Sequence, residues 1–317
     1  MPSSTHKLTD VLACPNCKTR ISLGPKSVTC TRCGSSYEVL LDTPILIKQH
    51  SPILEWYKPQ LIRMESKRLA RRLVRNLRGI YSSLKPSDRV WTRRSQKVIQ
   101  KMLEEKTPDA ADRYVVLIGA GFEPVYRHLL RTYKSIIRVG LPTAGTVNAI
   151  CDVCDLPFVE NSLDLIFSSS VLEHVYNPER AIDEMRTALK PGGYVYAEIP
   201  FMRAYHMIPV DYQRYTLSGI EELFKRHGFA MLDKGICSGP FTGFVLFLID
   251  FCGSVFSFNK YLRAIIDLAL SIVLHPVKYL DRFCENAKWA EISSCNFYYL
   301  GVRIQHIVES IGATSDH

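Results

Sequence analysis

The sequence contains no run of about 20 uninterrupted apolar residues, the length that a membrane-spanning helix requires. Its most apolar stretches lie between residues 240 and 280, and charges interrupt them at Asp250, Arg263 and Asp267. Residues 1–6 are polar and lack the apolar core of a signal peptide. We therefore expect a cytoplasmic protein in which residues 240–290 form an apolar helical pair that packs on a larger domain or lies in a membrane interface.

Because the chain lacks a secretion signal, its ten cysteines are expected to be reduced thiols or metal ligands rather than disulfides. Four of them form two CxxC pairs separated by 12 residues: Cys14, Cys17, Cys30 and Cys33. Each pair makes a tight knuckle that directs two thiolates to one point, and four protein ligands leave no open coordination position. We predict a structural zinc ion, or iron, in a ribbon over residues 1–48. The CxxC pair of Cys151 and Cys154 has no partner pair and is interpreted as core or cofactor-site cysteines.

Positive charge is concentrated between residues 58 and 106, where 15 Lys and Arg accompany four Asp and Glu, although the whole chain carries only +9. Apolar residues recur on one helical face of this segment, and arginines lie on the other. We expect a basic helical connector over residues 49–110. Its arginine face suits contact with the phosphates of an anionic membrane or of RNA, or simply solvent beside a packed helix. No RNA-binding motif accompanies the arginines, which weakens the nucleic-acid interpretation.

The second half of the sequence alternates strand and helix signals with the spacing of an open α/β sheet. Residues 163–168 and 194–199 are short apolar runs typical of buried parallel strands. Between them, Asn177 and Pro178 begin a helix, which is expected to end at Lys190 before a Pro-Gly-Gly stop. Such units form right-handed crossovers, and their ligands bind beyond the carboxyl ends of the strands.

Four short motifs occur in one order in this region: residues 155–158 (DLPF), 161–164 (NSLD), 172–175 (LEHV) and 189–193 (LKPGG). Together they resemble the class I S-adenosylmethionine-dependent methyltransferases, in particular the group that methylates small molecules, quinones, lipids and glycans. The resemblance implies an α/β, Rossmann-like domain with a seven-stranded sheet over residues 111–317, and the apolar helical pair would be inserted before its last strand. The N-terminal ribbon resembles the small zinc-ribbon activator subunit of tRNA methyltransferases.

The resemblance also implies a site for S-adenosylmethionine above a glycine turn that follows a strand at residues 114–118. It assigns to the cofactor Gly119, Ala120, Gly121, Glu123, Asp152, Val153, Leu156 and Ser168. Two acidic residues that are usual in the family are missing here: Leu117 stands before the turn, and Gly140 follows the next strand. Because a charge-assisted contact to the ribose is lost, we expect weaker cofactor binding than is normal for the family.

Residues 201–216 follow the strand at 194–199, so they begin at the carboxyl edge of the sheet. Their HxxPxDYxRYT pattern resembles one found in methyltransferases of glycan and cell-envelope pathways. We predict His206 as the base that takes the acceptor's proton, with His174 as the second candidate. Asp211 and Arg214 are expected to brace the loop.

These features predict methyl transfer from S-adenosylmethionine to a small-molecule, lipid-linked or glycan acceptor, in a protein that also holds a structural Zn²⁺ ion. Two alternatives stay open: a scaffold that has kept the fold and lost catalysis, and a zinc-ribbon ribosomal-RNA methyltransferase. Residues 240–280 and the basic connector together predict peripheral attachment to an anionic membrane.

Overall fold

The structure is a computed structural model of the 317-residue chain. It describes residues 8–24, 26–40, 42–54, 57, 86, 90–106, 113–119, 136–141, 147–206 and 210–305. Most of the predicted basic connector lies outside the described residues, and so do three residues assigned to the cofactor turn: Ala120, Gly121 and Glu123.

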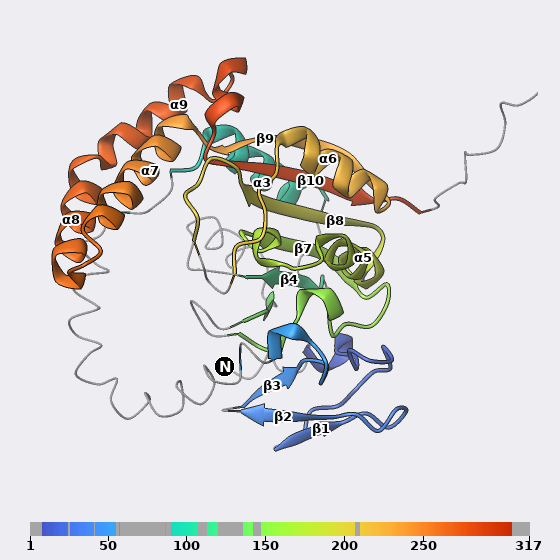
Figure 1. Cartoon of the computed structure of the whole chain (residues 1–317). Coiled ribbons are helices and arrows are strands. Elements are labelled where there is room, and N and C mark those ends of the chain that lie inside the picture. Colours follow the sequence, from blue (N-terminus) through green and yellow to red (C-terminus); the bar gives the residue numbers. More distant parts are fainter. Residues whose placement is uncertain are drawn as a thin grey trace, which may run out of the picture.

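A mixed six-stranded sheet occupies the centre of the protein, in the order β5-β4-β7-β8-β10-β9 (Figure 1). Its parallel part consists of β5 (Ile136–Val139), β4 (Val115–Ile118), β7 (Leu163–Ser169) and β8 (Leu189–Pro200). Strands β4 and β7 are buried along their whole length, as their apolar runs predict for parallel strands covered on both faces.

The other edge of the sheet is antiparallel. Strand β10 (Asn296–Arg303) lies between β8 and β9 (Phe229–Ser238) and runs opposite to both. The α/β class with a mixed sheet therefore agrees with the prediction.

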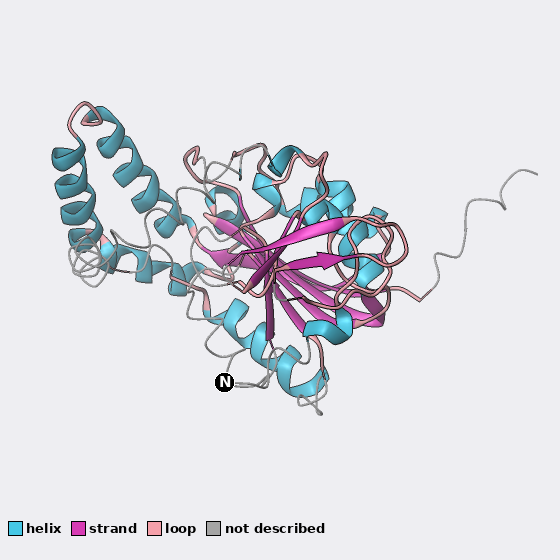
Figure 2. Ribbon diagram, turned by 90° about the horizontal axis from the view of Figure 1, so that it is seen from below, coloured by secondary structure: helices cyan, strands magenta, loops and turns pink. Residues whose placement is uncertain are grey.

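Helices cover both faces of the sheet (Figure 2). On one face, Trp91 and residues of α3 (Arg93–Lys106) pack against Leu117 and Phe167 of the parallel strands. On the other face, α5 (Pro178–Ala188) and α6 (Leu217–Arg226) bury apolar side chains that recur at helical spacing, including Ala181, Ile182, Met185, Ile220, Leu223 and Phe224. The sheet is thus the middle layer of three.

Helix α5 starts where the sequence predicts, because the Asn177 side chain accepts a hydrogen bond from the Arg180 backbone N–H. Its predicted end at Lys190 is wrong. Leu189 is already paired with Leu163 of β7, so strand β8 begins at this residue and the helix ends before it. The Lys190 ammonium instead lies 2.9 Å from a carboxylate oxygen of Asp164.

The N-terminal ribbon contains β1 (Ser27–Thr29), β2 (Ser36–Leu40) and β3 (Thr43–Leu46). Strand β3 pairs in parallel with β6 (Ile150–Cys151), and Ala149 makes a parallel bridge to Val139 of β5. The ribbon therefore continues the central sheet at its β5 edge. Among the described residues the central sheet has six strands, not the predicted seven, and the two-residue strand β6 belongs by its pairing to the sheet of the ribbon.

Two apolar helices, α7 (Pro240–Val255) and α8 (Lys260–Val273), connect β9 to β10 through short helical segments that include α9 (Asp281–Cys284). They form a hairpin that extends away from the sheet (Figures 1 and 2). Large apolar side chains are exposed along it, among them Phe244, Phe247, Phe251, Phe258, Tyr261, Ile265 and Val273. Within the described part of the chain, no helix has the length and apolar character needed to cross a membrane.

Candidate functional site

The four ribbon cysteines converge. Their sulfur atoms lie within 4.8 Å of one another, with Cys14 Sγ 3.6 Å from Cys33 Sγ and Cys17 Sγ 3.5 Å from Cys30 Sγ. Sulfurs around one tetrahedral zinc ion are about 3.8 Å apart, so this spacing fits a metal. Gly34 follows the second knuckle with a φ of +70°, a conformation that glycine adopts without strain.

Two glycine turns meet at the carboxyl ends of β4 and β5. Gly119 has a φ of +66°, and a Cβ atom there would lie 2.2 Å from Val171 Cγ2. Gly140 has a φ of +123°, and a Cβ atom there would lie 3.4 Å from the Gly119 backbone nitrogen. Both positions therefore require glycine, because a side chain would meet Val171 at Gly119 and the Gly119 backbone at Gly140. We call these two turns the glycine cradle, since glycine turns at the ends of strands are where nucleotide-like cofactors bind. Leu117 is buried in the layer packed against α3, so that position offers no acidic group to the cradle.

Asp152, the predicted adenine contact, is fully buried and already hydrogen-bonded. Its Oδ2 atom accepts from Ser51 Oγ at 2.6 Å, and Oδ1 accepts from the Cys154 backbone N–H at 2.9 Å. Burial raises the pKa of this carboxyl despite both bonds. Ser51 lies just beyond the ribbon strands, so the segment leaving the ribbon holds the carboxylate. Each oxygen can still accept a second hydrogen bond.

The other described residues assigned to the cofactor lie along the same edge. Val153 and Leu156 are buried in and beside a short helical turn after β6, and Ser168 is buried near the end of β7. The Leu156 carbonyl accepts a 2.7 Å hydrogen bond from Lys18 Nζ of the ribbon. Lys18 also pairs with Glu184 of α5. The ribbon and the segment that leaves it thus contact the predicted cofactor site at two points: Lys18 bonds the Leu156 backbone, and Ser51 bonds the Asp152 side chain.

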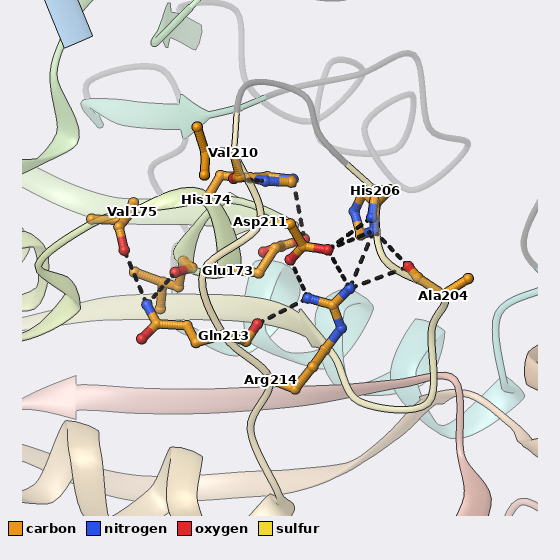
Figure 3. A network of polar contacts seen from close by, with 10 residues as sticks. Glu173, His174, Val175, Ala204, His206, Val210, Asp211, Gln213 and Arg214 are labelled. Atoms are coloured by element: carbon orange, nitrogen blue, oxygen red, sulfur yellow. Dashed lines mark hydrogen bonds and ion pairs between the residues drawn. The ribbon is translucent and has the colours of Figure 1, made fainter. Parts of the chain in front are cut away.

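The two predicted catalytic histidines lie together above the sheet, with ring centroids 5.0 Å apart and perpendicular planes (Figure 3). His174 ends a short helical turn after β7, and its Nδ1 atom is 2.7 Å from the Val210 carbonyl oxygen. His206 lies in the loop after β8, where its backbone N–H donates to Asp211 Oδ2 at 2.9 Å. The Gln213 amide donates to two carbonyls of the turn that carries His174, which fastens the loop to it.

An ion pair braces this loop, because Arg214 donates to both carboxylate oxygens of Asp211 (Figure 3). Burial alone would raise the pKa of Asp211, but these hydrogen bonds, the His206 backbone N–H and the charge of Arg214 lower it to about 2. Burial lowers the pKa of both His174 and His206, so both imidazoles are neutral at neutral pH. A neutral imidazole can accept a proton or bind a metal.

Sequence reasoning missed two buried glutamates near this edge. Glu198, near the end of β8, accepts hydrogen bonds from Trp91 Nε1 at 3.1 Å and Ser169 Oγ at 2.7 Å. Glu173 is fully buried, and one of its oxygens lies 3.8 Å from His174 Nε2. The only sequence signal for these residues was a carboxylate inside an apolar segment. Their interaction partners could not be predicted, because Trp91, for example, is 107 positions from Glu198.

An apolar groove of about 570 Å³ opens at the base of α7. It is lined mainly by aromatic and aliphatic side chains, including Phe201, Met202, Phe241, Phe244, Phe247 and Trp289. Arg203 lies at the groove, and its charge contributes to lowering the pKa of His206. The groove is therefore lined by the start of the loop that carries His206 and by the base of α7.

A family model described as a methyltransferase domain matches residues 118–197, which include β7, α5 and most of β8. A ubiquinone/menaquinone biosynthesis C-methyltransferase of Cupriavidus taiwanensis is 32% identical over 98 residues, covering 29% of this chain and 40% of the relative. The chain spans about half, or less, of the length of the first curated relatives it matches.

Among solved structures, phosphoethanolamine N-methyltransferase 2 of Haemonchus contortus, bound to S-adenosylhomocysteine, matches at 18% identity and a TM-score of 0.43, covering 67% of this chain and 53% of that one. A complex of the Haloferax volcanii Trm112 methyltransferase activator with a methyltransferase matches at 18% identity and a TM-score of 0.40, covering 69% and 99%. The domain match and the curated relatives agree with the motifs and the sheet. Residues 118–197 therefore form a methyltransferase domain, and its matches support a class I S-adenosylmethionine-dependent methyltransferase.

Proposed function

We propose that the protein transfers a methyl group from S-adenosylmethionine to an oxygen or similar nucleophile of a lipid-linked acceptor. The observation that carries the proposal is the cradle of Gly119 and Gly140 at the carboxyl ends of β4 and β5, inside the matched domain. Gly119 would lie against the cofactor, with Asp152 and Leu156 beside its adenine. Asp152 would serve there through the remaining acceptor positions of its bonded oxygens.

The histidine pair is placed to handle the acceptor's proton. When bound, S-adenosylmethionine supplies a methyl group whose bond to the sulfonium sulfur breaks, leaving the electron pair on sulfur, as the acceptor oxygen bonds to the carbon. His206, held by Asp211 and Arg214, would take the acceptor's proton, and His174 is the second candidate. Alignment of the acceptor oxygen with the methyl group would supply most of the acceleration, because the transfer is an in-line displacement.

The apolar groove favours a lipid-linked acceptor over a small polar one. Its apolar walls suit an isoprenoid or acyl chain, and Arg203 suits an adjacent phosphate. Because Arg203 and His206 belong to the same loop after β8, a head group bound at Arg203 would be presented beside the loop that carries the candidate base. The exposed apolar side chains of the α7–α8 hairpin would let the chain reach the groove from a membrane surface.

The four ribbon thiolates would hold a structural zinc ion, supported by their spacing and by the absence of an open ligand position in a four-thiolate site. The ribbon's contacts to Asp152 and Leu156 support a role in shaping the cofactor site. The same Ser51–Asp152 bond, together with Gly140 at the usual ribose-binding position, favours the non-catalytic scaffold as the second candidate.

Calorimetric titration of S-adenosylmethionine separates these candidates. We expect the wild-type protein to bind the cofactor and Gly119→Ala to bind it at least tenfold more weakly, because the new Cβ atom would collide with Val171 and displace the turn. Gly192→Ala is the matched control, since Gly192 also has a positive φ, +76°, but nothing lies near its Cβ position. Absence of binding by the wild type at millimolar cofactor would favour the scaffold, and unchanged binding by Gly119→Ala would place the pocket elsewhere.

A further inference from the structure

A second pocket, of about 640 Å³, lies between the ribbon and the methyltransferase domain. Its walls come from the second ribbon knuckle at residues 33–37, from residues 48–52, and from the start of α5 with the turn before it. It shares no lining residue with the apolar groove at α7. Small-molecule sites occupy about 300–1,000 Å³, so this pocket has the size of a ligand site. No ligand of the proposed methyl transfer is assigned to it.

Two cations converge on one carboxylate oxygen in the wall of this pocket. Lys48 Nζ donates to Asp155 Oδ1 at 2.5 Å, and Arg180 Nη2 donates to the same oxygen. Arg180 Nε also donates to the Cys154 carbonyl at 2.7 Å, which fixes the direction of the guanidinium. Asp155 is buried, whereas 27% of the Lys48 side chain and 48% of the Arg180 side chain are exposed. The cations, rather than the carboxylate, are therefore accessible to a ligand.

The charge of this cluster favours an anionic ligand. Asp155 is the only carboxylate among the described residues that line the pocket, and it offsets one of the two cations. Cys33 adds a thiol to the ribbon wall, and as a zinc ligand it would share its charge with the ion. Lysine and arginine carry more N–H donors than the bonds to Asp155 and the Cys154 carbonyl use, so donors remain for a second anion.

Aromatic rings border the same space. Tyr176 lies in the turn before α5, lines the pocket and is 38% exposed. His50, from the segment that leaves the ribbon, also lines it and is exposed. Planar rings stack on aromatic side chains, and nucleobases do so whatever their identity. The pocket therefore offers cations for a phosphate group and an aromatic surface for a ring attached to it.

We propose that this pocket binds a nucleotide-sized phosphate ester, with its phosphate between Lys48 and Arg180 and its ring against Tyr176. Arginine and lysine bind phosphate through charge-assisted hydrogen bonds, which are stronger than neutral ones. Ser51 belongs to the same wall, so the bound ligand would lie beside the segment that holds Asp152. The inference does not depend on the proposed methyl transfer.

The test is a calorimetric titration of the full chain, supplied with one equivalent of zinc, with uridine monophosphate. S-adenosylhomocysteine is present at millimolar concentration, so that the nucleotide does not enter the cofactor site. We expect one uridine monophosphate per chain, bound at least tenfold more weakly by Lys48→Gln and by Arg180→Gln, because each variant loses a charge-assisted bond. Both side chains are partly exposed, so each variant gives a separate measurement if the other does not fold.

Arg226→Gln is the matched control, because it removes the same charge from an exposed pair with Glu222 on α6, outside the pocket. It should bind uridine monophosphate like the wild type. No binding by the wild type at millimolar nucleotide, or equal affinity in the Lys48 and Arg180 variants, would overturn the proposal. Two further ligands test its parts: equally tight binding of uridine would refute the phosphate contact, and equally tight binding of inorganic phosphate would refute the ring contact.

Discussion

Ser51 and Asp152 are 101 positions apart in the chain and meet through a 2.6 Å hydrogen bond in the interior. The bond satisfies a buried carboxylate whose pKa burial raises. Removing the donor leaves that oxygen with a desolvation cost and no compensating bond. The stability of the ribbon-to-sheet contact should therefore be sensitive to this one hydroxyl.

We expect Ser51→Ala to lower the free energy of unfolding by about 1–3 kcal/mol at pH 7, the cost of an unsatisfied buried polar group. Urea denaturation measures the change. Ser36→Ala is the control, because the Ser36 hydroxyl makes an exposed 3.4 Å contact with Thr29 and its loss should cost less than about 0.5 kcal/mol. Equal effects of the two substitutions would show that the buried bond adds no stability.

Asp211 gives a prediction for acid pH. Its pKa in the folded protein is about 2, below the ordinary value of 3.8, so the ionised form stabilises the fold above pH 3.8 and this contribution disappears as the pH falls toward 2. Asp211→Asn lacks the contribution at every pH. The difference in unfolding free energy between wild type and variant should therefore be constant near neutrality and narrow between about pH 4 and pH 2. A difference that stays constant down to pH 2 would contradict the Arg214 pairing.

At the scale of elements, the sequence predicted best what local chemistry decides. The cap at Asn177, the buried strand β7 and the turn at Gly119 follow from side-chain and glycine preferences within a few residues. The end of α5 was mispredicted because Leu189 pairs with Leu163 of β7, an interaction with a residue distant in the chain. A Pro-Gly-Gly sequence indicates that a helix stops, but the partner strand decides where.

The site was predictable to the same extent. His174 and His206 were named individually from motifs as candidate bases, yet their perpendicular contact depends on a loop that Gln213 fastens to the turn after β7. The hydrogen bond between Trp91 and Glu198 joins residues 107 positions apart. Spacing along a chain contains no information on such pairs, because only the assembled sheet brings them together.

The α7–α8 hairpin makes a prediction at this scale. Phe258 is 80% exposed between the two helices, where it suits insertion into a lipid interface. We expect the protein to co-sediment with phosphatidylglycerol vesicles, less so at high salt, and Phe258→Ser to bind roughly tenfold more weakly, given the transfer energy of an aromatic side chain. Phe283→Ser, in α9 outside the hairpin, is the control, because Phe283 is 87% exposed. Equal sedimentation of the two variants would show that the hairpin does not insert.

At the scale of the whole molecule, the ribbon and the methyltransferase sheet share one set of backbone hydrogen bonds. Strand β3 continues through β6 toward β5, and side chains of the ribbon segment add further links at Lys18, Lys48 and Ser51. Lys48 Nζ lies 2.5 Å from Asp155, which also pairs with Arg180 of α5. The four-thiolate knuckles and the glycine cradle therefore lie at two ends of a connected framework.

In such a framework, binding of a ligand at one end changes the affinity for a ligand at the other end. If the metal orders the ribbon and the ribbon orders Asp152, then zinc and S-adenosylmethionine are coupled ligands, and linkage requires each to raise the affinity for the other by the same factor. Cys30→Ser, which removes a thiolate, should weaken cofactor binding by roughly 5- to 150-fold in calorimetry. Saturating cofactor should in return tighten zinc binding by that factor in a competition with a chelator. Identical cofactor affinity with and without zinc would mean that the zinc-bound ribbon does not affect cofactor binding.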